Sequence, residues 1–166
     1  MKREYKKGAG LHMLKIMMLL MMMQIVYAEK IHITSLSMEA EENKKEVHFI
    51  GDAKVVRGID WLHADRVVVY FDANDQIIRY VAIGKVTFDI TKEDKHFNGK
   101  ADKVVYVIHE SHYLLEGHAE VDEVLKNHHV DGDKITLDVV TGKVHVQGSI
   151  SKPVKLILET KDENGK

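Results

Sequence analysis

Histidines are the residues whose type and spacing could most directly do chemistry here. The chain has 11 of them, and two groups are close in sequence, His109 with His112 and His128 with His129. Imidazoles a few residues apart can converge on one transition-metal ion. No third ligand stands in register with either group, and two adjacent residues of a strand point to opposite faces. We therefore predict solvated histidines in turns and strands, and no metal site.

Two other stretches match functional motifs only in part. The segment 72–75 (Asp-Ala-Asn-Asp) has the acidic spacing of a calcium loop, but it lacks the glycine and the glutamate such a loop needs further on. Ser111 stands beside His112, but the sequence has no nucleophile elbow, phosphate loop or HExxH motif. We interpret residues 72–75 as a turn. We expect no catalytic residue, no cofactor and no enzyme activity.

Composition sets broader limits on the class of protein. The chain has 166 residues, one proline, 45% hydrophobic and 30% charged residues, which fits one globular domain rather than a disordered chain. It has no cysteine, so disulfides, thiolate zinc sites and cysteine nucleophiles are excluded. The net charge of −2 gives no reason to expect nucleic acid as a partner.

The first 28 residues differ in kind from the rest. They hold seven of the eight methionines and five basic residues, followed by the apolar run 16–26 and the ending Val26-Tyr27-Ala28. These are the parts of a signal peptide. We predict a signal peptide over 1–28, cleaved after Ala28, a domain over 29–160 and a charged tail over 161–166. The run is shorter than the roughly 20 apolar residues of a membrane-spanning helix, and an uncleaved anchor is the alternative.

The remainder predicts β-strands almost throughout. Apolar and polar residues alternate in runs over 47–55, 82–90, 113–121 and 144–150, with many valines and isoleucines. Such period-two alternation is typical of half-buried strands. Short polar turn signals lie between the runs, so neighbouring strands should form antiparallel hairpins. We predict an all-β domain without helices, in which residues 38–45 are a strand end and a charged turn.

Two short elements repeat along these strands. The first is a glycine followed two residues later by a small or apolar residue, and it occurs at Gly51, Gly84, Gly117 and Gly148. The second is a small residue, an aspartate and a basic residue, and its aspartates are Asp65, Asp102 and Asp133. Alternating repeats of about 33 residues predict stacked hairpin units. We interpret the glycines as points of close approach and the aspartates as turn caps.

This alternation resembles the OstA-like family, in its LptA-type branch of lipopolysaccharide-transport proteins. The elements at 51–55 and 117–121 alternate with those at 64–67 and 101–104, and the resemblance covers residues 34–158. It implies a periplasmic protein with a twisted, open β-jellyroll of two antiparallel sheets built from β-hairpin repeats. It also implies that acyl chains of lipopolysaccharide, in its lipid A part, lie between the sheets.

Given that resemblance, ten inward apolar residues are the predicted lipid lining. They are Phe49, Val55, Val69, Val86, Phe88, Tyr106, Leu115, Val121, Leu137 and Val146. Burial of each methylene is worth about 0.8 kcal/mol, so such a lining could carry acyl chains through water. The alternative is that these residues are only the core of a sandwich.

The first and last strands of the domain are predicted to be open edges. Ile33 and Leu36 mark one edge and Val154 and Leu156 the other, where Pro153 suits an edge position. The resemblance implies head-to-tail homo-oligomers, with an LptC-like inner-membrane partner at one end and an LptD-like outer-membrane partner at the other. The alternatives are a non-catalytic β-repeat scaffold and an LptC-like, membrane-anchored relative.

Overall fold

The computed structural model describes residues 30–92, 94–138 and 140–159, which form ten strands and two single 3-10 turns. The strands are β1 (Ile31–Thr34), β2 (Ser37–Glu41), β3 (Glu46–Arg57), β4 (Asp60–Phe71), β5 (Ile77–Lys92), β6 (Lys95–Val107), β7 (His112–Glu123), β8 (His128–Asp138), β9 (Val144–Gln147) and β10 (Lys155–Ile157). The 3-10 turns are η1 (Glu42–Lys44) and η2 (Val124–Lys126). The predicted all-β class is confirmed. The predicted signal peptide and charged tail lie outside the described residues.

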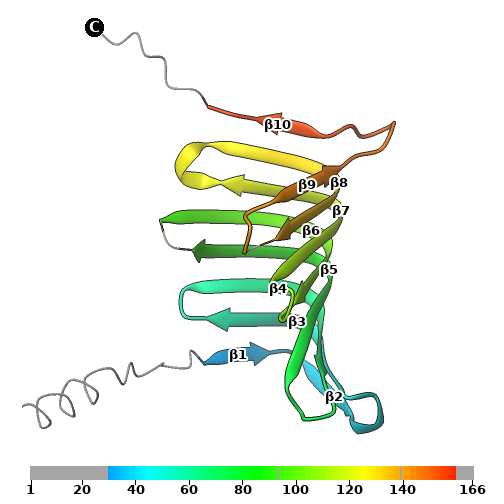
Figure 1. Ribbon diagram of the computed structural model, residues 1–166. Helices are drawn as coiled ribbons and strands as arrows, with labels where there is room; N and C mark the ends of the chain where they lie inside the picture. Colours follow the sequence, from blue (N-terminus) through cyan, green and yellow to red (C-terminus); the bar gives the residue numbers. More distant parts are fainter. Residues whose placement is uncertain (1–29, 93, 139, 160–166) are drawn as a thin grey trace, which may run out of the picture.

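All strand pairs are antiparallel, and they form one continuous ladder in the order β1-β3-β4-β5-β6-β7-β8-β10. Two further strands branch from its ends, since β2 also pairs with β3 and β9 also pairs with β8. The strands stack in chain order, with β1 and β2 at one end and β10 at the other (Figure 1). Within the described part of the chain, no helix is long and apolar enough to cross a membrane.

Apart from a second shift between Tyr70 and Phe71 at the end of β4, neighbouring long strands each change register once, and these changes line up across the sheet. They fall at 50–53 of β3, 63–66 of β4, 83–86 of β5, 100–103 of β6 and 116–119 of β7. Half-sheet 1 comprises β1, 53–57, 60–64, 86–92, 95–101, 119–123, 128–132 and β10. Half-sheet 2 comprises β2, 46–50, 66–71, 77–83, 103–107, 112–116, 134–138 and β9. They diverge from the shared crease in an open V (Figure 1). These two half-sheets are the two sheets of the predicted jellyroll.

The glycine elements make these bends. Gly84 and the following Lys85 have φ values of 83° and 47°, and Gly117 and His118 have 73° and 47°. Two successive left-handed residues turn the strand. They lie opposite a single residue of the neighbouring strand, and this arrangement is a β-bulge. A side chain at Gly84 would clash with the Asp65 carboxylate of the neighbouring strand, and one at Gly117 would clash with Asp102. The two repeated elements are therefore neighbours in space.

Two details of the repeat differ from expectation. The aspartates at 65, 102 and 133 lie within β4, β6 and β8, so the interpretation as turn caps is wrong. The fourth glycine element makes no bulge. Gly148 follows the end of β9, its φ is not left-handed, and Ile150 is fully exposed in the loop before β10. The strand predicted up to residue 150 ends at Gln147. Residues 148–154 instead connect β9 to β10, which pair with different parts of β8.

Small side chains fill the crease. Ala53, Ala64, Val86, Ala101 and Ala119 are at most 7% exposed and belong to one core cluster. Their size lets the two half-sheets approach closely along this line. The packed core continues into the adjoining row, where Val67, Ala82, Val104, Leu115 and Ile135 are also buried. Farther out the half-sheets separate.

The predicted turns are confirmed where the structure describes them. Residues 72–75 connect β4 and β5, and the Asp72 Oδ1 atom accepts hydrogen bonds from the backbone N–H groups of Asn74 and Gln76 at 2.8 and 2.9 Å. That carboxylate is therefore engaged in an ordinary Asx turn. His109 and Ser111 lie in the turn between β6 and β7, and residues 42–44 form the charged turn after β2.

Candidate functional site

Apolar side chains form rows across the inner faces of the V. In half-sheet 2 the row next to the crease is Phe49, Val67, Ala82, Val104, Leu115, Ile135 and Val146. The next row outward is Val47, Val69, Tyr80, Tyr106, Tyr113, Leu137 and Val144. Half-sheet 1 contributes Val55, Leu62, Phe88, Gly99, Val121, Val130 and Leu156. These rows line a trough that runs along the stack.

All ten residues of the predicted lining face this trough or its crease. Val86, Phe88 and Leu115 belong to the buried core cluster, and Val69 is also buried. Four others pack against the cluster, namely Phe49, Val55, Val121 and Val146. Tyr106 and Leu137 are half-buried in the second row. The structure thus places them on one surface, and their contact with lipid stays a prediction.

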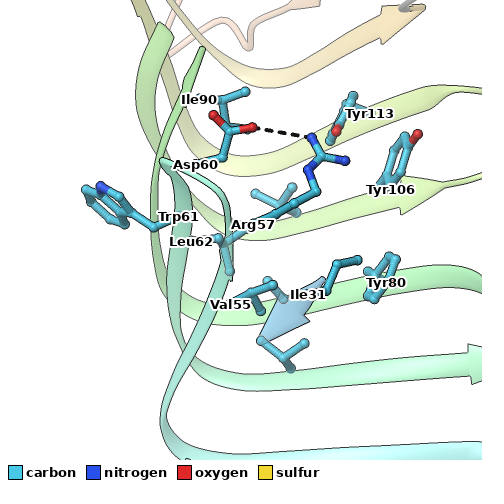
Figure 2. Close-up of a pocket in the computed structure, with 13 residues that line it drawn as sticks. Ile31, Val55, Arg57, Asp60, Trp61, Leu62, Tyr80, Ile90, Tyr106 and Tyr113 are labelled. Carbon is cyan, nitrogen blue, oxygen red and sulfur yellow. Dashed lines mark hydrogen bonds and ion pairs between the residues drawn. The ribbon is translucent and has the colours of Figure 1, made fainter. Parts of the chain in front are cut away.

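A cavity of about 130 Å³ lies in the trough near the β1 end (Figure 2). Its lining from half-sheet 1 includes Ile31, Val55, Leu62 and Ile90. Its lining from half-sheet 2 includes Tyr80, Ala82, Tyr106 and Tyr113. Of the ten residues predicted, only Val55 and Tyr106 line it. Tyr80 and Tyr113 were not predicted to line the trough. Like Tyr106, they alternate in step with residues predicted to point inward, and this was the signal that could have identified them.

The tyrosines give the cavity an aromatic wall. The rings of Tyr106 and Tyr113 stack with centroids 4.2 Å apart and planes 16° apart. Burial raises the pKa of Tyr113 to about 12 and also raises the pKa of Tyr80, because the phenolate would lose its hydration. Both phenols are therefore uncharged at neutral pH, which suits contact with an apolar ligand.

One ion pair, absent from the sequence-based expectations, lies at the edge of this cavity. Arg57 and Asp60 are directly opposite across the β3–β4 hairpin, and the Arg57 Nη2 atom donates to Asp60 Oδ2 at 3.3 Å. Asp60 Oδ1 also accepts a hydrogen bond from the Thr91 backbone N–H at 2.8 Å. A turn signal at residues 57–58 does not by itself predict that Arg57 and Asp60 face inward. Their parity with Val55 and Leu62 was the signal that these side chains face inward.

The two ends of the stack carry open edges and exposed apolar side chains. At one end Ile33 lies in β1, and Leu36 lies in the bend between β1 and β2 and is 84% exposed. At the other end Val154 directly precedes β10 and Leu156 lies within it, both about half exposed. In the described residues, β1, β2, β9 and β10 each have one strand neighbour. The four predicted edge residues are thus at or next to edge strands.

His129 and His48 each contact acidic side chains in the part of the chain that is described. His129 lies between Asp122 and Asp131, at 2.7 and 3.3 Å, and the hydrogen bond with Asp122 raises its pKa. One mixed cluster was not foreseen, in which ligand atoms of Glu41, Glu46 and His48 lie within 4.8 Å of one another.

Basic groups already balance that cluster. Lys44 lies 2.6 Å from Glu41, and Arg66 contacts the second ring nitrogen of His48 at 2.5 Å. His48 Nε2 is 2.9 Å from Glu46. Two carboxylates thus face two cations, and the histidine uses both ring nitrogens. This closed ion-pair network leaves the cluster poorly suited to a cation.

Comparison with known proteins decides the family. A family model described as "LptA/(LptD N-terminal domain) LPS transport protein" matches residues 32–143. The match spans more than half of the chain and reaches from β1 past the end of β8. The chain belongs to this LptA/LptD N-terminal family. A search of curated protein sequences found no match.

A solved relative of the LptA/LptD N-terminal family shares the fold. LptH from Pseudomonas aeruginosa is described as the LptA-homologous periplasmic component of the lipopolysaccharide transport device. It superposes with a TM-score of 0.68 at 15% sequence identity, over 80% of this chain and 96% of that chain. The OstA-like, LptA-type resemblance and the open β-jellyroll are thereby confirmed. The family's described role is transport, which agrees with the expectation that the chain is not an enzyme.

Proposed function

We propose that the chain is a periplasmic lipopolysaccharide-binding protein that carries or bridges lipopolysaccharide from the inner to the outer membrane. The acyl chains of lipid A lie in the trough between the half-sheets. The observation that supports this is the open V itself, whose two facing surfaces are apolar and enclose a cavity near β1. A close-packed scaffold would bring these surfaces together along their whole width.

The trough offers chemistry suited to acyl chains. Each methylene that leaves water contributes about 0.8 kcal/mol, so a chain of ten or more carbons gains several kcal/mol from the inner rows. The cavity of about 130 Å³ is smaller than a typical ligand pocket, which is roughly 300–1,000 Å³. It therefore holds part of one chain, and the remaining length follows the second row from Tyr80 toward Leu137.

Site-specific photo-crosslinking in cells tests this proposal. In one variant a photo-crosslinking residue replaces Tyr106, which lines the trough. In the control variant it replaces Tyr70, which does not line the cavity and whose ring is covered by Arg79 of the neighbouring strand. We expect lipopolysaccharide adducts at Tyr106 and none at Tyr70. The two positions are matched in residue type and sit in the same half-sheet. Equal adducts at both positions, or none at Tyr106 in a folded and abundant protein, would contradict the proposal.

We further propose that protomers join end to end. The edge strands β9 and β10 of one protomer add to β2 and β1 of the next, so the trough continues from one protomer into another. Unpaired N–H and C=O groups at these edges favour strand addition, and the exposed apolar residues there lose water on pairing. An LptC-like inner-membrane protein and an LptD-like outer-membrane protein would cap the two ends by the same strand addition.

Two alternatives keep the same fold. A scaffold would assemble through the edges without lipid adducts at Tyr106. An LptC-like anchored relative would carry lipid but keep residues 1–28 in the inner membrane. Fractionation of cells and N-terminal sequencing of the exported protein separate the last case, because cleavage after Ala28 releases the domain from the membrane.

A further inference from the structure

A second hollow of the described structure lies on the outer face of half-sheet 1, and we call it the outer groove. It measures about 430 Å³, within the range of roughly 300–1,000 Å³ that is usual for ligand sites. Its lining includes Trp61, Asp89, Asn98, Lys100, Glu120 and Asp122. Along their strands these residues alternate with the inward row of half-sheet 1, so they share the opposite face. Trp61 borders the trough cavity as well.

Four of these residues form one row across the outer groove. Trp61 of β4 pairs with Asp89 of β5, which pairs with Asn98 of β6. Asn98 in turn pairs with Asp122 of β7. Neighbouring strands are about 4.8 Å apart, so the row is about 14 Å long. The Trp61 ring lies beside that of His63, which has the same parity, with 5.2 Å between the centroids. An elongated ligand of two small rings therefore fits along the row.

The charged side chains of the outer groove already have partners. The pairs, at 2.9, 2.9 and 2.7 Å, are Asp89 with His96, Lys100 with Glu120, and Asp122 with His129. The hydrogen bond with Asp122 also raises the pKa of His129. A charged ligand would have to displace one of these partners. The groove is therefore better suited to an uncharged ligand.

Two neutral polar groups of the same row are free to bind a ligand. Among the described residues, neither the Asn98 amide nor the indole N–H of Trp61 makes a hydrogen bond. Asn98 is half-buried in the middle of the row, between Asp89 and Asp122. An amide both donates and accepts hydrogen bonds, and a paired carboxylate keeps lone pairs that can accept more. Such groups beside an aromatic ring match the hydroxyls and the C–H faces of a sugar.

We propose that the outer groove binds a neutral saccharide the size of a disaccharide. One sugar ring packs against the indole of Trp61, and the next is held by the Asn98 amide and the neighbouring carboxylates. The site does not depend on the proposed lipid-carrying function, because the row that forms it lies on the face of half-sheet 1 opposite the trough. A free glycan and the sugar part of a glycolipid offer the same hydroxyls, and the experiment separates these two sources.

Trp61 is the only tryptophan of the chain, so its fluorescence reports on the outer groove. N,N′-Diacetylchitobiose, a neutral disaccharide, is titrated into the protein and compared with chitobiose, its positively charged deacetylated form. The NMR signals of the Asn98 side-chain amide give a second readout. The variant is Asn98→Leu, which keeps a similar size without polar atoms. The control is Thr136→Val, which removes a neutral hydroxyl from the outer face of half-sheet 2, outside the groove.

We expect the neutral disaccharide to shift the Trp61 fluorescence saturably, with an affinity that does not change with salt concentration. Asn98→Leu should weaken binding about 3- to 10-fold, the usual effect of losing neutral hydrogen bonds. Thr136→Val should bind as the wild type does, and chitobiose should bind no more tightly than the neutral form. Asn98→Ala takes the place of Asn98→Leu if the latter does not fold.

The octyl glycoside of the same disaccharide, below its micelle concentration, identifies the source of the sugar. Equal affinity for the free and the octyl-linked disaccharide supports a free glycan as the ligand. Tighter binding of the octyl form, still weakened by Asn98→Leu, supports a glycolipid whose sugar occupies the groove.

Four results would overturn the proposal. The first is no saturable change in Trp61 fluorescence or in the Asn98 amide signals with either form of the disaccharide. The second is an equal effect of Asn98→Leu and Thr136→Val, and the third is tighter binding of chitobiose, which would make the ligand a cation. The fourth is binding of the octyl form alone, abolished by Ala82→Phe, which fills the trough cavity. That result would place the ligand in the trough and leave the lipid-carrying function intact.

Discussion

Three pairs of residues bend the long strands, and each pair shows how a local conformation sets the shape of the trough. Gly51 with Asp52, and the corresponding pairs at 84–85 and 117–118, all have positive φ. The second residue of each pair is not glycine, and an L-residue in this region costs roughly 1–2 kcal/mol. Packing of the small residues of the crease offsets that cost. His118 also contacts Asp102 at 2.8 Å, although both side chains are too exposed for a large gain.

Gly117→Ala is predicted to destabilise the protein by about 2–4 kcal/mol. The added methyl group meets a strained backbone with φ of 73° and clashes with the Asp102 carboxylate. Urea unfolding followed by circular dichroism measures the change. Gly142→Ala is the matched control, because φ there is 69° but nothing lies near the added atom. We expect the control to lose about 1 kcal/mol. Equal losses at both sites would show that the contact with Asp102 has no role.

Tyr113 gives the stability a predictable dependence at high pH. Its folded pKa, about 12, lies above the ordinary value of 10, so the folded state holds the phenol proton more tightly than the unfolded state. The contribution of the Tyr113 phenol to the free energy of unfolding is complete below pH 10 and is lost as the pH rises toward 12. Between pH 9.5 and 11.5 we expect Tyr113→Phe to lose about 1–2 kcal/mol less stability than the wild type, measured by urea unfolding. Parallel pH profiles for the two proteins would contradict this assignment.

At the scale of elements, the strands at the two ends differ from those inside the stack. Each interior strand is paired along both of its edges, and its side chains continue the inner rows from one neighbour to the next. At the ends, β1, β2, β9 and β10 are short and carry exposed apolar residues such as Leu36 and Leu156. An open edge of this kind tends to pair with another strand. The ends therefore have the properties of an interface, and assembly should depend on them.

Leu156→Asp is predicted to abolish end-to-end assembly. Leu156 pairs with Val130 at the edge and is 57% exposed, so an aspartate there places an unpaired charge in the proposed interface. Light scattering over a range of protein concentrations should show growth for the wild type and a monomer for the variant. Ile150→Asp is the control, since Ile150 is fully exposed in the loop before β10. Loss of assembly in both variants, or in neither, would contradict pairing through β10.

On the scale of the whole molecule, one continuous ladder acts as two facing surfaces. Close packing is concentrated at the crease and in the row next to it, and the half-sheets diverge farther out (Figure 1). The cavity lies between them because the second row carries three tyrosines opposite Val55 and Ile90. A molecule built this way holds an apolar ligand without a closed pocket, and a long ligand can extend along the stack.

Filling the cavity should block ligand entry at a moderate cost in stability. Ala82 lines the cavity in half-sheet 2, and in Ala82→Phe the added ring occupies space that is otherwise open. We expect binding of a fluorescent acyl-chain probe to fall at least tenfold, while the free energy of unfolding changes by no more than about 1–3 kcal/mol. Thr87→Phe, on an exposed position of β5, is the control. Unchanged probe binding in Ala82→Phe would place the acyl chain elsewhere.

Much of the fold follows from local patterns in the sequence. Period-two alternation predicted the strands, and polar turn signals such as residues 72–75 predicted the hairpins, because side-chain direction and turn geometry depend on a few neighbouring residues. The same parity predicted which residues face inward, as Tyr106 and Leu115 do. The regular spacing of Gly51, Gly84 and Gly117 predicted stacked units for the same reason.

Tertiary structure alone decided how these strands combine. The sequence did not show that Gly117 packs against Asp102, that both half-sheets belong to one bent ladder, or that Gly148 makes no bulge. Nor did it show Arg57 and Asp60 at the cavity. Each of these depends on which strands lie side by side and at what angle, and contacts between residues far apart in the chain set that angle. The period of a strand is a local property, whereas the space between two half-sheets exists only once the whole stack has formed.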